Sequence, residues 1–262
     1  MGFLIFCREG VMYLNDRIYY IHGETPAMRV AGEALALQGH CVAKSPSRAV
    51  THLVLGVPCR MDQEELAALL SKLSAEVRVF GGFLDRKELE GYRCYDLLKN
   101  EDYLAQNAAI TAHCALWIAM NQLPMTLQHC PVLILGWGRI GKHLAGLLKG
   151  LGADVTVAVR KDDQRAMLRA FGYEGETLPV PEYILPRFRV VFNTVPAPVL
   201  SAEALAHCRT DCIKIELASS PGMEGEDIID GRGLPGKLAP ENSGKLIART
   251  ILRLSAGKED AS

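Results

Sequence analysis

One segment constrains the fold of this chain more than any other: an apolar run at residues 132–135 that stops at three spaced glycines. The run leads into Gly-Trp-Gly-Arg-Ile-Gly at positions 136–141, and helical spacing of apolar residues follows over 142–151. A short apolar run is typical of a strand buried in a parallel sheet. The segment therefore predicts a strand, a tight turn and a helix, which is the first half of a parallel α/β unit.

Each glycine of this fingerprint has its own expected task. Gly136 makes the tight turn, Gly138 lets the backbone approach a pyrophosphate, and Gly141 lets the helix pack close to the strand. The helix N-terminus offers N–H groups to the phosphates. A second strand over 154–159 supplies the context that favours a dinucleotide site over a chance Gly-rich junction. The expected cofactor contacts are Gly136, Trp137 (whose ring would border the cofactor), Gly138, Arg139, Ile140 and Gly141.

The residue after the second strand predicts which dinucleotide binds. NAD enzymes usually carry Asp or Glu there, which binds the ribose 2′-hydroxyl. This chain has Arg160 followed by Lys161, and a cationic side chain can hold a 2′-phosphate. Asp162 and Asp163 dilute the charge, so a solvated basic loop is the alternative. The pattern favours NADP and leaves NAD open.

Composition bounds the class of protein. A chain of 262 residues, 49% hydrophobic and with net charge −1, is typical of a globular protein that is long enough for two domains. The near-neutral charge gives no reason to expect nucleic acid or an anionic membrane as partner. No apolar run reaches the length of a membrane span. Residues 1–8 lack a basic leader and a cleavage site, so no signal peptide is expected.

Eight cysteines are scattered along the chain, and none forms a Cys-x-x-Cys pair. A reduced, cytoplasmic protein with mostly buried thiols is the simplest interpretation. Cys208 and Cys212 are one helical turn apart, beside His207, but no further ligand lies near them in the sequence. We therefore predict no metal site.

Strands and helices alternate along the whole chain, which predicts an α/β fold with two Rossmann-like, doubly wound parallel-sheet domains joined by interdomain helices. Strands are expected over 17–22, 41–43, 51–57 and 77–80, and helices over 26–37 and 62–73. The expected domains are an N-terminal cleft domain over 1–100, a helical linker over 101–128, an NAD(P)-binding Rossmann domain over 129–240, and a C-terminal helix and tail over 241–262. The linker contains a strongly apolar helix over 107–120, expected to be buried, and Pro124 ends or kinks it. Asn242 or Ser243 is the expected N-cap of the last helix.

Two further strand ends carry polar residues. One strand runs into Asn-Thr-Val-Pro at 193–196, and another into Ala-Ser-Ser-Pro-Gly at 218–222. Ligands in open α/β sheets bind outside the carboxyl ends of the strands. We expect Asn193, Thr194, Val195 and Pro196 at the cofactor ribose or carboxamide. Ser219 and Ser220 are expected to contact the nicotinamide or the substrate, and simple turns are the alternative.

These motifs together resemble the dipicolinate synthase A family, which is related in architecture to D-2-hydroxyacid dehydrogenases. The resemblance covers residues 95–256. It rests on the fingerprint, on Asn-Thr-Val-Pro, on Glu-Leu-Ala-Ser-Ser-Pro-Gly at 216–222, and on Gly-Leu-Pro-Gly-Lys-Leu-Ala-Pro-Glu-Asn-Ser-Gly at 233–244. It implies an NAD(P)-dependent step from a tetrahydrodipicolinate precursor to dipicolinate during sporulation. It also implies a small dicarboxylate substrate and a flavoprotein-like partner, dipicolinate synthase B; we further expect a homodimer.

Two departures from the family pattern bear on catalysis. The interdomain helix of the family opens with Thr-x-Glu-Gly, whereas this chain has His113 where the Glu is expected, and Ser220 stands where Arg is usual. His113 could face the cleft as a charged or proton-accepting group, or it could be a core histidine. The expected catalytic residues are therefore His113, Ser219 and Ser220.

The departures keep two other functions open. One is a diverged or non-catalytic protein that binds NADP as part of a complex. The other is a D-2-hydroxyacid dehydrogenase-like enzyme, which needs an Arg for the substrate carboxylate and a late His. No His follows His207, and residues 216–223 contain no Arg.

Overall fold

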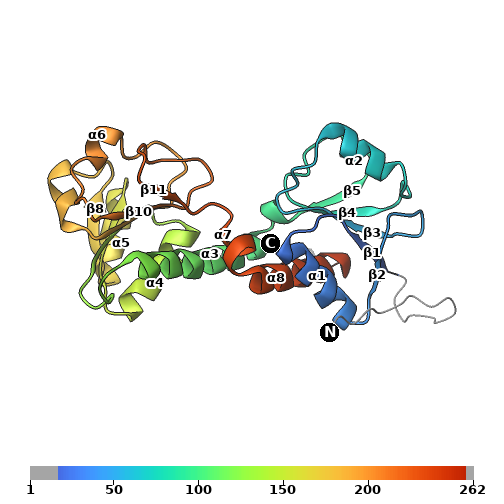
Figure 1. Cartoon of the computed structure of the whole chain (residues 1–262), viewed down its shortest axis with the longest axis horizontal. Coiled ribbons are helices and arrows are strands. Elements are labelled where there is room, and N and C mark those ends of the chain that lie inside the picture. The colour runs from blue at the N-terminus through green and yellow to red at the C-terminus, as the bar shows by residue number, and fades with distance from the viewer. Residues whose placement is uncertain (1–16, 258–262) are drawn as a thin grey trace. The chain divides into compact units, whose positions relative to one another are not determined.

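The computed structural model describes residues 17–257, which form two compact units of α/β structure (Figure 1). One unit contains the described residues up to Asn107 together with those from Ala239 onward, and the other runs from Ala108 to Leu238. The predicted fold class, two Rossmann-like parallel sheets, is confirmed. The predictions made for residues 1–8 and for the C-terminal tail lie outside the described residues.

The first unit is built on a five-stranded sheet in the order β2-β1-β3-β4-β5, and every neighbouring pair is parallel. Four strands lie where the sequence predicts them. The fifth strand, Arg-Cys-Tyr-Asp, lies at an edge of the sheet. It was not predicted, because its sequence contains no apolar run. The strands are β1 Ile18–Ile21, β2 Cys41–Ala43, β3 His52–Val54, β4 Arg78–Gly81 and β5 Arg93–Asp96.

Three helices cover this sheet. Helix α2 (Gln63–Leu70) packs on one face, while α1 (Pro26–Leu37) and α8 (Pro240–Ser255) lie side by side on the other (Figure 1). The hydroxyl of Thr25 caps α1 by accepting a hydrogen bond from the Met28 amide, 3.3 Å away. A Cβ on Gly244 would lie 2.4 Å from the carbonyl oxygen of Ala27, so glycine permits the close approach of α8 to α1. Short 3₁₀ turns occur at Lys87–Leu89 and Leu97–Lys99.

The last helix begins earlier than the sequence predicts. Its N-cap is Ala239 and its first residue is Pro240, so Asn242 and Ser243 lie in the first turn and do not cap it. Proline is favoured at the first helical position because its missing N–H would have no partner there. The helix belongs to the first unit, although it follows the second in sequence.

The second unit contains a six-stranded parallel sheet in the order β11-β10-β9-β6-β7-β8. The chain moves outward from β6 to β8, returns to β9 on the other side of β6, and then continues to β11. The boundary between β6 and β9 is therefore the topological switch point of the sheet. The strands are β6 Pro131–Leu135, β7 Asp154–Val159, β8 Glu174–Thr177, β9 Val190–Asn193, β10 Ile213–Glu216 and β11 Ile228–Asp230.

Helices α4 (Arg139–Gly150) and α5 (Asp162–Ala170) cover one face of this sheet. The 3₁₀ segment Glu182–Arg187 and the short α6 (Ala202–Leu205) close a core on the other face. Helix α7 (Leu234–Leu238) follows β11. The two edge strands β8 and β11 are short and carry acidic residues, which leaves little apolar pattern to predict them from sequence.

Helix α3 (Glu101–Gln122) spans the boundary between the units and ends two residues before Pro124, as predicted. Only part of its surface is buried: Trp117 is 57% exposed and Met120 is 52% exposed. His113 is also exposed, so it is not a core histidine. None of the helices in residues 17–257 combines the length and apolar character that a membrane span needs.

Candidate functional site

At two positions of the fingerprint, the backbone conformation or contacts within the chain require glycine. Gly136 has a φ of +99°, and a Cβ there would lie 2.7 Å from Thr194 Oγ1. A Cβ on Gly141 would lie 2.4 Å from the carbonyl oxygen of Gly136. These positions make the tight turn and the close strand–helix contact that the sequence predicts.

Gly138 differs from both. Its φ is −81°, which any residue can adopt, and no atom lies within 4 Å of a Cβ built there. It is the N-cap of α4, where no side chain caps the helix and no acidic residue occupies the first turn. No capping side chain therefore competes with a pyrophosphate for the backbone N–H groups of that turn.

The turn after β9 packs directly against the fingerprint. Leu135 at the end of β6 is opposite Asn193 at the end of β9. The amide and the hydroxyl of Thr194 both donate hydrogen bonds to the Leu135 carbonyl oxygen, at 3.0 and 2.8 Å. The predicted convergence of these two strand ends is present, and it lies at the switch point where open α/β sheets bind ligands.

Asn193 does not offer its side chain to a ligand. The residue is fully buried. Its Nδ2 group donates to both carboxylate oxygens of Glu216, at 2.8 and 2.9 Å, and to the Val195 carbonyl at 3.0 Å. Its Oδ1 accepts from the Val195 amide at 2.9 Å. In place of the expected contact with the cofactor, Asn193 holds the turn that carries Thr194 and Val195.

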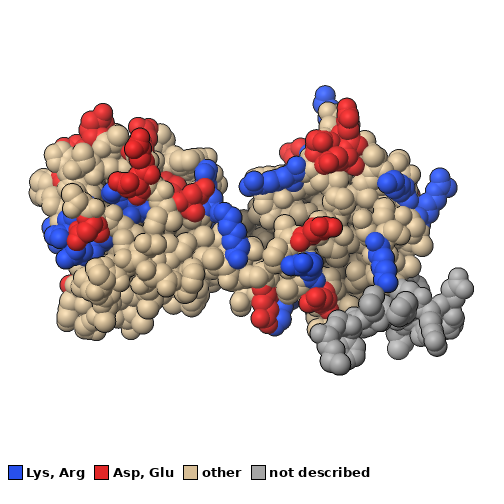
Figure 2. Space-filling model, viewed as in Figure 1, with Lys and Arg blue, Asp and Glu red and all other residues tan. Residues whose placement is uncertain are grey.

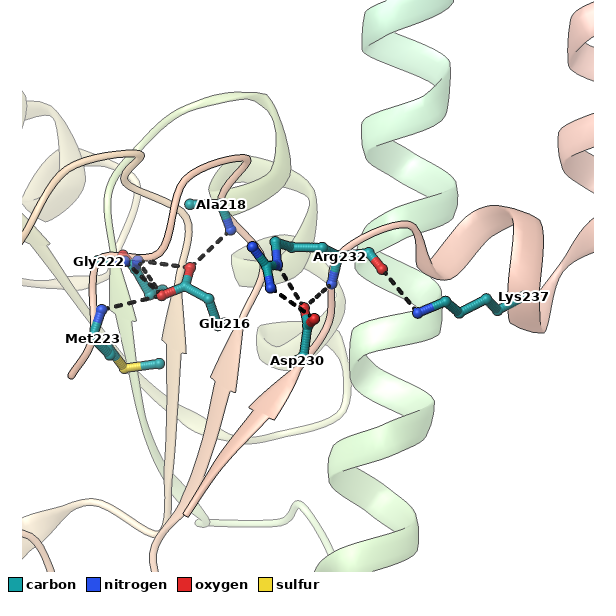
Figure 3. Close-up of polar contacts among 8 residues, drawn as sticks. Glu216, Ala218, Gly222, Met223, Asp230, Arg232 and Lys237 are labelled. Atoms are coloured by element: carbon teal, nitrogen blue, oxygen red, sulfur yellow. Dashed lines mark hydrogen bonds and ion pairs between the residues drawn. The ribbon is translucent and has the colours of Figure 1, made fainter. Parts of the chain in front are cut away.

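Glu216, at the carboxyl end of β10, was not predicted as a site residue. Its side chain is buried, with the residue 3% exposed, and it accepts hydrogen bonds from the amides of Ala218, Gly222 and Met223 as well as from Asn193 (Figure 3). The one sequence signal is an acidic residue that ends an apolar strand. The predicted residues Ser219 and Ser220 are exposed in the loop that these bonds hold.

The basic pair at the end of β7 is exposed, as the NADP prediction requires. Arg160 and Lys161 both face solvent. Asp162, one of the acids that could neutralise them, forms an ion pair with Arg165. Arg165 also donates to the carbonyls of Val159 and Arg160, at 3.2 and 3.4 Å. Asp162 is therefore paired within α5, and the positive charge of the Arg160–Lys161 pair is less diluted than the sequence suggests.

The ring of Trp137, which was expected to border the cofactor, packs against side chains of the second unit. It meets the ring of Tyr173 edge-on, with centroids 5.5 Å apart. The ammonium group of Lys149 lies 4.7 Å from the centre of the Tyr173 ring. Trp137 thus lines a pocket of about 680 Å³ between α4 and α5. The other lining residues are Lys142, Asp163, Gln164, Met167, Phe171 and Tyr173.

A charged pair lies at the carboxyl end of β11, next to the Glu216 loop (Figure 3). The guanidinium of Arg232 donates to both carboxylate oxygens of Asp230, at 2.8 and 2.9 Å. These hydrogen bonds, with one from the Arg232 amide, lower the pKa of Asp230 to about 2. Lys237 Nζ donates to the carbonyl oxygen of Arg232 at 3.4 Å. Glu216 lies opposite Asp230 and its charge acts on Arg232, so two cations and two anions gather at these strand ends.

The remaining polar side chains form neither a metal site nor a disulfide in the part of the chain that the structure describes. Among residues 17–257, no three His, Cys, Asp or Glu side chains are grouped in a way that could hold a metal ion. The seven cysteines of that range are free thiols. Figure 2 shows acidic and basic side chains interspersed on the visible face of each unit, with broad uncharged areas between them.

The region around the fingerprint matches a known cofactor domain. Residues 109–231 match the model of the family described as the NAD binding domain of D-isomer specific 2-hydroxyacid dehydrogenases. The match covers β6 to β11, which are the elements that form the site described above.

Two curated proteins are similar in sequence. The chain is 26% identical over 169 residues to dipicolinate synthase A of Bacillus subtilis (strain 168), which covers 61% of this chain and 57% of that protein. It is 28% identical over 171 residues to glutamyl-tRNA reductase of Idiomarina loihiensis, with 61% of this chain and 40% of that protein covered. The aligned part of the chain spans about half the length of these relatives.

Among solved structures, the crystal structure of dipicolinate synthase A from Bacillus halodurans superposes with a TM-score of 0.81 and 21% sequence identity. The superposition covers 94% of this chain and 99% of that one. At this identity the likeness concerns the fold, and it includes both sheets.

Proposed function

We propose that this chain, a homologue of dipicolinate synthase A, is an NAD(P)-dependent oxidoreductase that acts on a small dicarboxylate. By analogy with that relative, the proposed reaction is the step from a tetrahydrodipicolinate precursor to dipicolinate in a sporulating bacterium. The nicotinamide would supply hydride transfer. The residues of the chain would hold the cofactor, orient the substrate and exclude water.

The observation that carries the proposal is the geometry around Gly138. Two neighbouring glycines are explained by contacts within the chain, but nothing in the chain requires glycine at 138. A backbone that must approach a ligand closely explains it. The match to an NAD binding domain over 109–231 supports the same assignment.

We assign the adenosine half of the cofactor to β7 and the nicotinamide half to β9 and β10. Arg160 and Lys161 at the end of β7 would bind the 2′-phosphate of NADP, because Asp162 is paired with Arg165. Thr194 and Val195 would lie beside the nicotinamide ribose, since they flank Gly136. NADP is therefore the proposed cofactor, with NAD as the competitor in the test below.

We place the substrate carboxylates near β10 and β11. Arg232 and Lys237 are the cations at this strand end, and a cationic side chain can bind a carboxylate of the substrate. Ser219 and Ser220 are exposed in the adjoining loop and can donate hydrogen bonds. His113, exposed on α3, is the proposed proton-handling residue.

The remaining assignments follow the resemblance to dipicolinate synthase A. We propose a complex with a flavoprotein-like partner, dipicolinate synthase B, and a homodimer of this chain. The cytoplasmic location is proposed from the cysteine pattern of the sequence.

Isothermal titration of the purified chain with NADPH, NADP⁺, NADH and NAD⁺ tests the cofactor. The proposal expects saturable binding, tighter for the 2′-phosphorylated pair. Absorbance at the nicotinamide band then tests turnover, after addition of the tetrahydrodipicolinate precursor with dipicolinate synthase B. If the chain binds none of the four cofactors, the proposal that it is an oxidoreductase is refuted.

A second function has a specific observation behind it: the family match is to D-2-hydroxyacid dehydrogenases. Oxidation of 2-hydroxy acids by the chain alone would favour that activity. The lack of His after position 207, and of Arg in 216–223, argues against it. Tight NADPH binding without turnover on either substrate would indicate a non-catalytic protein.

A further inference from the structure

We propose that Glu216 is a positioning residue that fixes the nicotinamide-side edge of the cofactor site, an inference that rests on the proposed function. It would act through the loops it holds, without touching the cofactor. The carboxylate joins the end of β9 to the loop after β10, and these are the two segments that carry Thr194, Ser219 and Ser220.

The carboxylate of Glu216 has hydrogen-bond donors on both oxygens. Oε1 accepts from Asn193 Nδ2 at 2.8 Å and from the Ala218 amide at 2.9 Å. Oε2 accepts from Asn193 Nδ2 at 2.9 Å, from the Gly222 amide at 2.8 Å and from the Met223 amide at 3.2 Å. Bonds to an ionised acceptor are shorter and stronger than neutral ones. A carboxylate that is 3% exposed and has five such bonds therefore fixes its donors firmly.

The bonded amides lie on both sides of a short exposed segment, residues 219–221. Ala218 precedes this segment and Gly222 follows it, while Ser219, Ser220 and Pro221 are exposed between them (Figure 3 shows the two bonded ends). The C-terminal end of the segment also packs tightly, because a Cβ on Gly222 would lie 2.5 Å from Asn193 Nδ2. Glu216 thus determines where the serine side chains stand.

The same carboxylate controls the neighbouring turn. Asn193 Nδ2 donates to the Glu216 carboxylate, and Asn193 Oδ1 accepts from the Val195 amide. Loss of the carboxylate would release Asn193, and with it the turn that presses Val195 against Gly136. One buried side chain therefore sets two of the segments on the β9–β10 side of the switch point.

The geometry predicts an effect on half of the cofactor only. Arg160 and the N-terminus of α4, to which the adenosine and the pyrophosphate are assigned above, lie on the β6–β7 side, and Glu216 makes its hydrogen bonds to other residues. A dinucleotide lying across the sheet edge brings its nicotinamide over β9 and β10. Glu216 should therefore matter for ligands that contain the nicotinamide and not for ligands that lack it.

The test compares NADPH with 2′-phospho-ADP-ribose, which lacks the nicotinamide, on the full chain carrying Glu216→Gln. Either orientation of the glutamine turns an NH₂ group toward backbone N–H donors, so at least two bonds are lost. We expect NADPH affinity to fall on the order of tenfold or more, while affinity for the fragment stays within about twofold. An equal loss for both ligands, or no loss for either, would overturn the proposal.

A matched control lies at the other edge of the same sheet. Glu174 in β8 accepts from Thr156 at 2.9 Å and pairs with Arg187 at 3.2 Å. Glu174→Gln should change neither affinity, because β8 does not carry the nicotinamide-side loops. If it reproduces the selective NADPH loss of Glu216→Gln, the assignment to Glu216 is wrong.

A measurement on the unmodified protein covers the case in which Glu216→Gln does not fold. The amides of Ala218, Gly222 and Met223 should be protected from hydrogen exchange without cofactor, by at least about tenfold over the Ser219 and Ser220 amides. Exchange at the rate of those serines would overturn the inference. If the unmodified chain binds neither ligand, the proposed function fails, and this exchange pattern still decides whether Glu216 holds the loops.

Discussion

The hydroxyl oxygen of Thr194 lies 2.7 Å from the position that a Cβ on Gly136 would take. The same hydroxyl donates a hydrogen bond to the carbonyl of the preceding residue, Leu135. The fingerprint turn and the turn after β9 are thus packed so closely that each fixes the other. Gly136 and Gly138 differ in this respect, and the difference can be measured.

Gly136→Ala should destabilise the second unit by about 1–3 kcal/mol, the usual cost of placing a side chain in a strained backbone region. The positive φ and the contact with Thr194 act together. Urea unfolding measures the change. Gly138→Ala is the control and should change stability by less than about 1 kcal/mol; equal losses for both variants would contradict the assignment of roles.

Gly138→Val should leave the fold intact and abolish dinucleotide binding. Open space surrounds the position within the chain, so the branched side chain meets only the ligand. Circular dichroism should remain close to that of the unmodified protein, while calorimetry with NADPH shows no saturable heat. Unchanged binding would mean that the cofactor lies elsewhere.

Arg160→Asp should shift preference from NADP toward NAD by about 1–3 kcal/mol, the size of a charge-assisted hydrogen bond. The new carboxylate repels the 2′-phosphate and can accept a hydrogen bond from a free 2′-hydroxyl. Titration with both cofactors gives the ratio. Arg169→Asp makes the same charge change in the last turn of α5 and should leave the ratio alone; equal affinities in the unmodified protein would reject the NADP proposal.

His113→Ala should weaken dicarboxylate binding by about three- to tenfold without affecting dinucleotide affinity, because a ring N–H of the imidazole can donate a hydrogen bond to a carboxylate. Calorimetry with each ligand measures both affinities. Because His113 is exposed, melting temperature should not fall. His207→Ala, at another exposed histidine, should leave the dicarboxylate affinity unchanged; an unchanged affinity in His113→Ala would contradict the role of His113.

His52 should make the first unit less stable in acid. Burial, aided by the charges of Arg78, Arg17 and His40, lowers its pKa from 6.5 to about 4. Between these values the unfolded chain binds a proton that the folded chain does not. The stabilisation is therefore complete above pH 6.5 and is lost as pH falls toward 4, by roughly 3 kcal/mol.

Urea unfolding at several pH values between 4 and 7.5 measures this loss. His52→Asn should reduce the slope of the profile over this range, and the slope that remains is expected from His40, whose pKa is also lowered by burial. His22→Asn, at a histidine beyond the end of β1 that is only partly buried, should leave the slope as it is. A steep profile that survives His52→Asn would assign the acid sensitivity to other groups.

The sequence by itself determined the parallel α/β class, most of the elements and the place of the fingerprint. These follow from local rules: apolar runs for buried strands, helical spacing, and glycines at fixed distances. Helix α1 was predicted with its observed bounds, Pro26–Leu37. The edge strands β5, β8 and β11 escaped prediction because a short strand with little burial has no apolar pattern.

Only the tertiary structure decided which polar side chains are exposed and available to a ligand, and which are buried in hydrogen bonds within the protein. Asn193 and Ser219 look alike in sequence, since each follows or ends a strand. Yet Asn193 is buried with its amide bonded to Glu216, whereas Ser219 is exposed. That difference depends on a carboxylate 23 residues away. Hydrogen bonds between distant segments form only when the sheet brings β9 beside β10, so no local pattern in the sequence records them.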